Sequence, residues 1–344
     1  MNTFPRSIPS ELLKHACPSI QYRTRLEILH EPVDSLLMQD LQNQILELKA
    51  VQDIICLQEP EGWLSQDFHG YNSTESGLRF LREMGLSCDH PVITRSLKAL
   101  DTYPGRLYLG IGKVGLILDE LGFGGSQMIR AFLFAKANVE DKPFIQDQIE
   151  IALDGFRSVL NIEDIKQITE PYLNLLVFKP GISWPGIYHL RLLALTKSWR
   201  TPKNKKILCE AVERLIALSP IPDIKVCYKS QWIAPVSFCM LNFVPDMESM
   251  NDGDWMMWFR RMELLSRMGI VDTVSELRDQ VNTLEHLLND SQGIFTKKLN
   301  HYSFKKWGAY TGLMLEEDWR SPKRRVYDLT FRSYLILHYS SIRN

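Results

Sequence analysis

The sequence predicts an all-α protein, and the spacing of its apolar residues is the main reason. Apolar side chains recur every three or four residues along most of the 344-residue chain, as they do in amphipathic helices. We find no clear stretch in which apolar and polar residues alternate between hairpin turns, as in half-buried strands. The helical spacing covers residues 77–100, 128–136, 144–160, 187–197, 205–218, 257–268, 272–288 and 328–340.

The first of these ranges, 77–100, predicts two helices joined by a short turn. Gly85 favours a helix end because glycine readily adopts left-handed backbone angles, and Pro91 favours the first turn of a new helix. An apolar stripe continues on both sides of the turn, at Leu78, Leu81, Met84, Val92, Ile93, Leu97 and Leu100. The range therefore predicts a helical hairpin.

Three similar passages predict that such hairpins repeat along the chain. Each has a turn glycine, an aromatic residue soon after it, and then a Leu-rich segment expected to be helical. When the Leu-rich segments are superposed, Trp184 in the second passage aligns with Trp307 in the third. The passages begin at Gly62, Gly181 and Gly293.

Two shorter similarities support the repeat. SWRTPK at 198–203 and DWRSPK at 318–323 each place a hydroxyl residue before a proline, so the hydroxyl is expected to cap a helix that starts at the proline. LREMGL at 81–86 and LSRMGI at 265–270 each end in a glycine suited to a left-handed helix end.

Residues 45–100 resemble one unit of the prenyltransferase and squalene-cyclase repeat. Gln58, Gly62 and Trp63 match its signature of a helix, a glutamine, a short charged turn with Gly and Trp, and a second helix. HGYNSTESGL, from His69, is similar to the start of an inner helix in protein prenyltransferase β-subunits. In the later units the glutamine is missing or displaced. In this repeat the Trp ring packs on the turn and the Gln amide caps backbone groups of a neighbouring helix, so we interpret Trp63 as structural.

The resemblance implies an α/α toroid, in which helical hairpins close around a central cavity with inner helices facing it and outer helices behind. We expect an N-terminal arm at residues 1–30 that wraps the outside, and a single toroid domain at residues 31–344. Ordinary helix lengths lead us to expect roughly 11 to 14 helices.

The alignment of the three units predicts that a set of polar and aromatic residues lies at the cavity end of the inner helices. Each of them taken alone is also a good core residue, but together they predict an aromatic-lined pocket. The expected ligand-binding residues are His69, Tyr71, Trp184, Tyr188, His189, Trp307, Tyr310 and Thr311, and the candidate catalytic carboxylates are Glu75, Asp252 and Asp254.

The catalytic signatures of the family that the chain resembles are missing. The Asp-x-Asp-Asp stretch of alkene-protonating cyclases is absent, and NDGDW at 251–255 is more typical of a loop or a helix start. No DDxxD magnesium site is present. The consecutive residues of CDHP at 88–91 cannot all reach one tetrahedral zinc. We therefore expect no metal and no cofactor, and the family's activity does not follow from its fold.

Three functions remain open. The first is binding or processing of a bulky apolar, isoprenoid-like ligand in the aromatic cavity. The second is carbohydrate cleavage, which requires paired carboxylates; LEEDWR at 315–320 offers some, although a solvated helix end explains it better. The third is a non-catalytic helical-repeat scaffold for protein interaction. The Gly-rich segment 110–125 lacks a preceding strand and the Lys-Ser/Thr pair of a phosphate loop, so its glycines are better explained by close helix packing.

The composition also indicates which partners and which cellular location to expect. The 40 Lys and Arg residues nearly balance the 41 Asp and Glu residues, for a formal charge of −1, so no nucleic-acid partner is expected. The six cysteines are scattered, which favours reduced thiols. The N-terminus lacks the apolar run of a secretory signal, and no apolar stretch is long enough to span a membrane, so a cytoplasmic protein is expected. The sequence does not indicate an oligomeric state.

Overall fold

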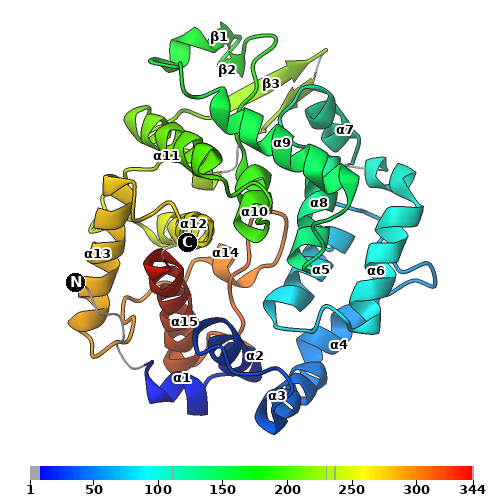
Figure 1. Ribbon diagram of the computed structural model, residues 1–344, viewed down its shortest axis with the longest axis vertical. Helices are drawn as coiled ribbons and strands as arrows, with labels where there is room; N and C mark the ends of the chain where they lie inside the picture. The colour runs from blue at the N-terminus through cyan, green and yellow to red at the C-terminus, as the bar shows by residue number, and fades with distance from the viewer. Residues whose placement is uncertain (1–7, 110–111, 230, 236–237, 343–344) are drawn as a thin grey trace.

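The computed structural model describes residues 8–109, 112–229, 231–235 and 238–342. Most of this part of the chain is helical, and a small sheet lies at one edge of the molecule (Figure 1). The helices of the N-terminal half are α1 (Ser10–Lys14), α2 (Pro18–Arg23), the π-helical turn η1 (Thr24–Ile28), α3 (Leu36–Glu47), α4 (Lys49–Ile55), α5 (Thr74–Glu83), α6 (Pro91–Thr102), α7 (Gly112–Glu120), α8 (Ser126–Lys136) and α9 (Pro143–Arg157). Those of the C-terminal half are α10 (Ile187–Leu195), α11 (Pro202–Ala217), α12 (Asp252–Met268), α13 (Ser275–Asn289), α14 (Tyr302–Lys305) and α15 (Pro322–Ser341).

All the ranges with helical spacing lie on helices, to within a few residues at their ends. The two helices predicted at 77–100 are α5 and α6; Gly85, between them, has a φ of 93°, and Pro91 is the first residue of α6. Gly269 at the end of α12 has a φ of 71°. These glycines confirm the predicted left-handed helix ends, because residues with a Cβ rarely adopt such angles.

The all-α prediction is wrong for two short regions, which form a four-stranded mixed sheet. β1 and β2 are antiparallel, β2 and β3 are parallel, and β3 and β4 are antiparallel. Each strand has only three to five residues, which is too short for an alternating pattern to stand out in the sequence. The strands are β1 (Thr169–Tyr172), β2 (Leu175–Phe178), β3 (Ile224–Tyr228) and β4 (Gln231–Ile233).

The helices pack in a consistent order. α5 contacts α8, α8 contacts α10, α10 contacts α12, and α12 contacts α15, which in turn packs on α2 and η1. α9, α11 and α13 lie farther from the middle of the molecule than α8, α10 and α12 (Figure 1). α9 contacts both α8 and α10, and α13 contacts α15. The sheet lies beside α9 and α11, at the periphery (Figure 1).

The segment that we expected as an N-terminal arm, residues 1–30, is described from residue 8 onward. Within the described residues, α1, α2 and η1 occupy most of 10–28, and their side chains enter the core; Leu12 and Ile20 are buried. Arg23 is also buried and pairs with Glu83 at the end of α5. This segment therefore packs between α15 and α5.

The local predictions made from the similar passages have different outcomes. Thr201 caps α11 through its hydroxyl, as predicted, whereas Ser321 occupies the N-cap position of α15 but its hydroxyl makes no capping bond. The third Leu-rich segment was expected to be helical, but residues 306–321 contain no helix. Gly312 explains this difference, because its φ of 93° turns the backbone back against the ring of Trp307.

The structural interpretation of Trp63 is confirmed. Its side chain is fully buried, and the guanidinium group of Arg106 lies 4.7 Å from the centre of the indole ring. The Gln58 amide donates to the carbonyl oxygens of Gly62, at 3.2 Å, and of Val92 in the first turn of α6, at 2.8 Å. Gln58 thereby joins the turn to the neighbouring helix.

We predict that Gln58→Ala lowers the free energy of unfolding by about 1–3 kcal/mol, because the bonds of its amide to the Gly62 and Val92 carbonyl oxygens are lost in a partly buried site. Chemical denaturation monitored by circular dichroism measures this change. Gln39→Ala is the matched control, because the exposed Gln39 amide bonds only to Asp34 within its own turn. Equal, small effects of both substitutions would contradict the assigned role of Gln58.

Candidate functional site

A cleft of about 310 Å³ opens between α7, α8, the start of α10, and the chain that follows β4. Its wall is mostly apolar, and three polar or aromatic residues, His69, Tyr188 and Tyr310, form one side of it. This volume and this mixture are typical of small-molecule sites. The apolar lining comes from Val114, Leu118, Phe123, Ile129, Ile187, Trp232, Ile233, Ala234 and Pro235.

Glycines allow the cleft to form where α7 meets α8. A Cβ atom on Gly115 would lie 2.0 Å from the hydroxyl oxygen of Ser126, and one on Gly125 would lie 1.8 Å from the carbonyl oxygen of Gly115. Asp119 caps the same junction by accepting from the backbone N–H groups of Gly125 and Gln127. These contacts confirm that the Gly-rich segment serves close packing, over the residues of it that the structure describes.

Behind the polar side of the cleft lies a buried carboxylate, Glu75. Its Oε2 is 2.8 Å from Nδ1 of His69, and its Oε1 accepts from the Tyr188 hydroxyl at 2.7 Å. Nη1 of Arg191 is 3.5 Å from the same Oε1. Glu75 itself is fully buried, while the His69 side chain is 17 % exposed. His69 therefore forms the link between the carboxylate and the cleft.

Local sequence sets the positions of these side chains. Ser73 and Ser76 form a reciprocal capping box that starts α5, which places Glu75 in the first turn of that helix. A carboxylate is favoured there by the exposed N–H groups and the helix dipole. Gly186 starts α10 and places Tyr188 in its first turn, with Arg191 one turn further on the same face. Two helix N-termini thus meet at the site.

Electrostatics keep Glu75 ionised. Burial alone would raise the pKa of its carboxyl group, but the hydrogen bond from His69 and the charge of Arg191 outweigh this effect, and the pKa is lowered. Burial, followed by the charge of Glu75, raises the pKa of Tyr188 well above its usual value. Tyr188 is therefore a neutral donor to Glu75. Because an ionised carboxylate only accepts, the proton between Glu75 and His69 belongs to His69 Nδ1.

The structure brings together four of the residues that the sequence alignment sent to one cavity. The ring centres of His69, Tyr188 and Tyr310 are 5.8 to 6.1 Å apart, and Glu75 lies behind them. Tyr310 reaches this place from the non-helical segment 306–321. Residues from all three similar sequence passages thus meet at one site.

His189 also borders the cleft but has no exposed surface. Its Nδ1 accepts from the Gly186 N–H at 3.0 Å, and burial lowers the pKa of its imidazole to about 4, so it is neutral at physiological pH. Gly124 and Gly155 make room for the ring, because Cβ atoms there would lie 2.6 and 3.0 Å from it. His189 fixes the start of α10 and has little surface for a ligand.

The remaining aromatic candidates lie outside this group. Trp184 is buried and packs on Phe178 of β2. Tyr71 is 53 % exposed, beside Lys306. Trp307 and Thr311 belong to the 306–321 segment; the Trp307 indole donates to the Met314 carbonyl, and the Thr311 hydroxyl donates to the Lys306 carbonyl.

The two other candidate carboxylates lie at the start of α12. Asn251 caps this helix, and Asp254 completes its capping box. Asp252 accepts from the backbone N–H of Asn300 at 2.6 Å. Among the residues that the structure describes, no contact joins either aspartate to Glu75, and neither lines the cleft.

Sequence reasoning missed three arginines close to the site, Arg79, Arg191 and Arg260, which are all buried. Each interrupts an apolar helix face, as Arg191 does in IYHLRLLAL, and a charged residue in such a face is the signal that would have identified them. Within the described residues no group of three or more His, Cys, Asp and Glu side chains is arranged to hold a metal ion, and no helix is long and apolar enough to cross a membrane.

No protein-family model, curated protein or solved structure matches the chain. The function is therefore argued from the geometry of the site.

We predict that Glu75→Gln lowers the free energy of unfolding by about 2 kcal/mol at pH 7, because hydrogen bonds to an ionised acceptor are replaced by neutral ones. The pKa of Glu75 is lower in the folded state than in the unfolded chain, so its stabilisation is present above about pH 4 and is lost as the pH falls through the folded value. Urea unfolding at pH 7, 5 and 3 measures both the difference and its decrease.

Glu47→Gln is the control for this pH series, because Glu47 lies exposed on α3. It is expected to follow the wild type at every pH. A difference between Glu75→Gln and wild type that stays constant down to pH 3 would show that the carboxylate charge is not what stabilises the site.

Proposed function

We propose that the helical hairpins close into an α/α toroid and that the cleft binds a bulky, mostly apolar, isoprenoid-like molecule. The order of contacts from α5 through α8, α10 and α12 to α15 supports the ring. The Arg23–Glu83 pair supports its closure, because it joins the N-terminal segment, which packs on α15, back to α5. Helices α9 and α13 then belong to the outer layer (Figure 1).

One observation carries the ligand class: an apolar cleft ends at a hydrogen-bonded His69–Glu75–Tyr188 group. Because most of the described wall is apolar, it offers few side-chain hydrogen-bond partners for a hydroxyl-rich ligand, whereas hydrocarbon gains free energy by leaving water for it. The aromatic side chains suit a ligand with double bonds, because they stack on flat apolar groups. A ligand with a long apolar body and one polar end fits this distribution.

The polar end of the cleft is built for proton transfer. Glu75 fixes the His69 tautomer with Nδ1 protonated, which leaves Nε2 as a proton acceptor. Tyr188 holds Glu75 from the other side. His69 thus acts as a base and then as an acid toward the polar end of the ligand, with Glu75 as its positioning residue.

Carbohydrate cleavage receives less support. A two-carboxylate mechanism needs both groups at the cleft, within roughly 5–10 Å of each other. Glu75 lies behind the cleft, bonded to His69 and Tyr188, while Asp252 and Asp254 cap another helix. Glu316 of the acidic stretch is buried, and it accepts from the backbone N–H of Cys17.

We expect Leu118→Trp to weaken binding of farnesol at least ~10-fold, because the indole occupies the apolar part of the cleft. Leu116→Trp is the matched control: Leu116 lies on the same helix α7, 38 % exposed and outside the cleft. Isothermal titration calorimetry of wild type and both variants measures the affinities.

Native mass spectrometry of the freshly purified protein supplies the independent readout, because a co-purified lipid is expected in wild type and in Leu116→Trp but not in Leu118→Trp. The proposal is contradicted if wild type does not bind farnesol and no apolar molecule co-purifies with it. Equal affinities for the two tryptophan variants would show that a bound ligand lies elsewhere.

A further inference from the structure

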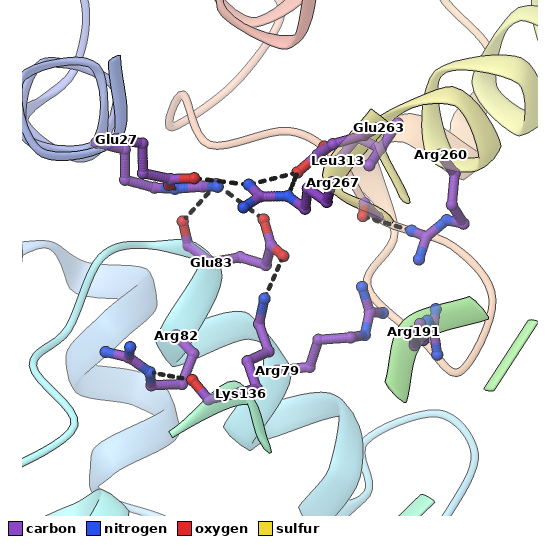
Figure 2. A network of polar contacts seen from close by, with 12 residues as sticks. Glu27, Arg79, Arg82, Glu83, Lys136, Arg191, Arg260, Glu263, Arg267 and Leu313 are labelled. Carbon is purple, nitrogen blue, oxygen red and sulfur yellow. Dashed lines mark hydrogen bonds and ion pairs between the residues drawn. The ribbon is translucent and has the colours of Figure 1, made fainter. Parts of the chain in front are cut away.

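The middle of the molecule contains two groups of buried charges that differ in how well they are paired. In the first group, three carboxylates accept from four cationic side chains (Figure 2). Glu83 binds Lys136 at 2.6 Å, and Glu263 binds Arg267 at 2.9 Å. We call this group the paired network; it consists of Glu27, Glu83, Glu263, Arg23, Lys136, Arg267 and Arg332.

The second group is the arginine triad, Arg79, Arg191 and Arg260. These residues come from three different helices, α5, α10 and α12, and their guanidinium ends turn toward one another (Figure 2). They are 2 to 5 % exposed. Among the described residues, the carboxylate within ion-pair distance of the triad is Glu75, at 3.5 Å from Arg191, and it is already shared with His69 and Tyr188.

The other contacts of the triad are to neutral groups. Arg79 donates to the carbonyl oxygens of Gly308 and Thr311, and Arg260 donates to that of Gly312 at 2.8 Å. Arg79 also lies over the Trp307 ring. Carbonyl oxygens and rings satisfy hydrogen bonds but carry no net charge, so they do not neutralise the triad.

Buried nitrogen atoms of the triad still lack an acceptor. These are Nη2 of Arg191 and the Nε atoms of Arg79 and Arg260. The like charges also oppose one another: burial and then the charge of Arg191 lower the pKa of Arg79, to about 10, and burial followed by the charges of Arg79 and Arg191 lowers the pKa of Arg260. An arrangement of buried, unneutralised cations is unfavourable unless an anion is bound among them.

We propose that the arginine triad is a binding site for a doubly charged oxyanion of the phosphate class. Three guanidinium charges minus the one charge of Glu75 leave two positive charges for the ligand to neutralise. Guanidinium groups match the oxygens of phosphate through parallel N–H donors. A tetrahedral anion also presents its oxygens in several directions, which suits donors that come from three helices.

The triad lies next to the cleft. Arg79 is one turn after Glu75 on α5, and Arg191 is one turn after Tyr188 on α10, with its guanidinium group 4.7 Å from the Tyr188 ring. The oxyanion therefore comes from one of two sources, free phosphate or the phosphate end of a molecule whose body lies in the cleft. Only the second source rests on the proposed function.

Arg191→Met tests the site with the least disturbance, because Arg191 holds no carbonyl oxygen of the 306–321 segment and Met keeps much of its apolar volume. In wild type, 10 mM phosphate is expected to raise the melting temperature by about 3 °C relative to chloride at equal ionic strength. In Arg191→Met this rise is expected to be absent. Without phosphate, the melting temperature of the variant serves as its own baseline, because the lost contact with Glu75 and the lost repulsion from Arg79 and Arg260 act in opposite directions.

Arg261→Met is the matched control. Arg261 follows Arg260 on α12 and is as buried as Arg191, but it donates to the Cys239 carbonyl and is not part of the triad. It is expected to lose stability but to keep the phosphate response. A phosphate response of equal size in wild type and Arg191→Met, or none in wild type measured by both melting and calorimetry, overturns the proposal.

The source of the anion is separated by n-octyl phosphate and n-octanol. If the anion is the phosphate end of a molecule in the cleft, n-octyl phosphate is expected to raise the melting temperature more than phosphate or n-octanol at the same concentration. Leu118→Trp is then expected to remove this extra rise. If the anion is free phosphate, n-octyl phosphate is expected to raise the melting temperature no more than phosphate does. Either result supports the triad as an oxyanion site, provided that Arg191→Met loses the rise in melting temperature. If only the proposed cleft function is wrong, the rise with free phosphate remains.

Discussion

The paired network of buried charges fixes the helices around the middle of the molecule. Glu83, at the end of α5, accepts from Arg23 of α2, Lys136 of α8 and Arg332 of α15. Burial alone would raise the pKa of Glu83, but these three cations outweigh it and lower the pKa well below its usual value. Removing one partner from such a buried network typically costs about 3–5 kcal/mol, because the remaining charge is left without water or a counter-charge. The relative positions of these four helices are therefore strongly constrained.

This constraint has a direct effect on the candidate site. Glu75 and Glu83 lie at opposite ends of α5, about 12 Å apart along the helix axis. The network holds one end of the helix, and the other end presents Glu75 to His69 and Tyr188. Between the two lies Arg79, whose charge neither carboxylate pairs with directly, in a part of the interior with an excess of positive charge. The fold thus places the hydrogen-bonded His69–Glu75–Tyr188 group, an apolar cleft and a cationic centre side by side.

Several features could be predicted from sequence because their physical causes are local. Helix periodicity, the glycine at the end of α12, and the Gln58–Trp63 turn all depend on residues close together in the chain. Other expectations failed because distant contacts decide them. Segment 306–321 carries a Leu-rich pattern yet is not helical, because Gly312 folds it back on Trp307 and buried arginines bind its carbonyl groups. The four strands were missed because each depends on a partner strand rather than on a pattern of its own.

The sequence by itself determined a mostly helical protein, the ends of its main helices, and the polar and aromatic residues that lead into them. It also named His69, Glu75, Tyr188 and Tyr310 for one site, because the alignment of the three similar passages placed them toward one cavity. Only the tertiary structure decided which of the named residues meet, since burial and charge pairing are properties of the space between helices. The unneutralised arginine triad shows this most clearly, because each helix by itself shows only one arginine in an apolar face, and the missing counter-charge appears only where the three meet.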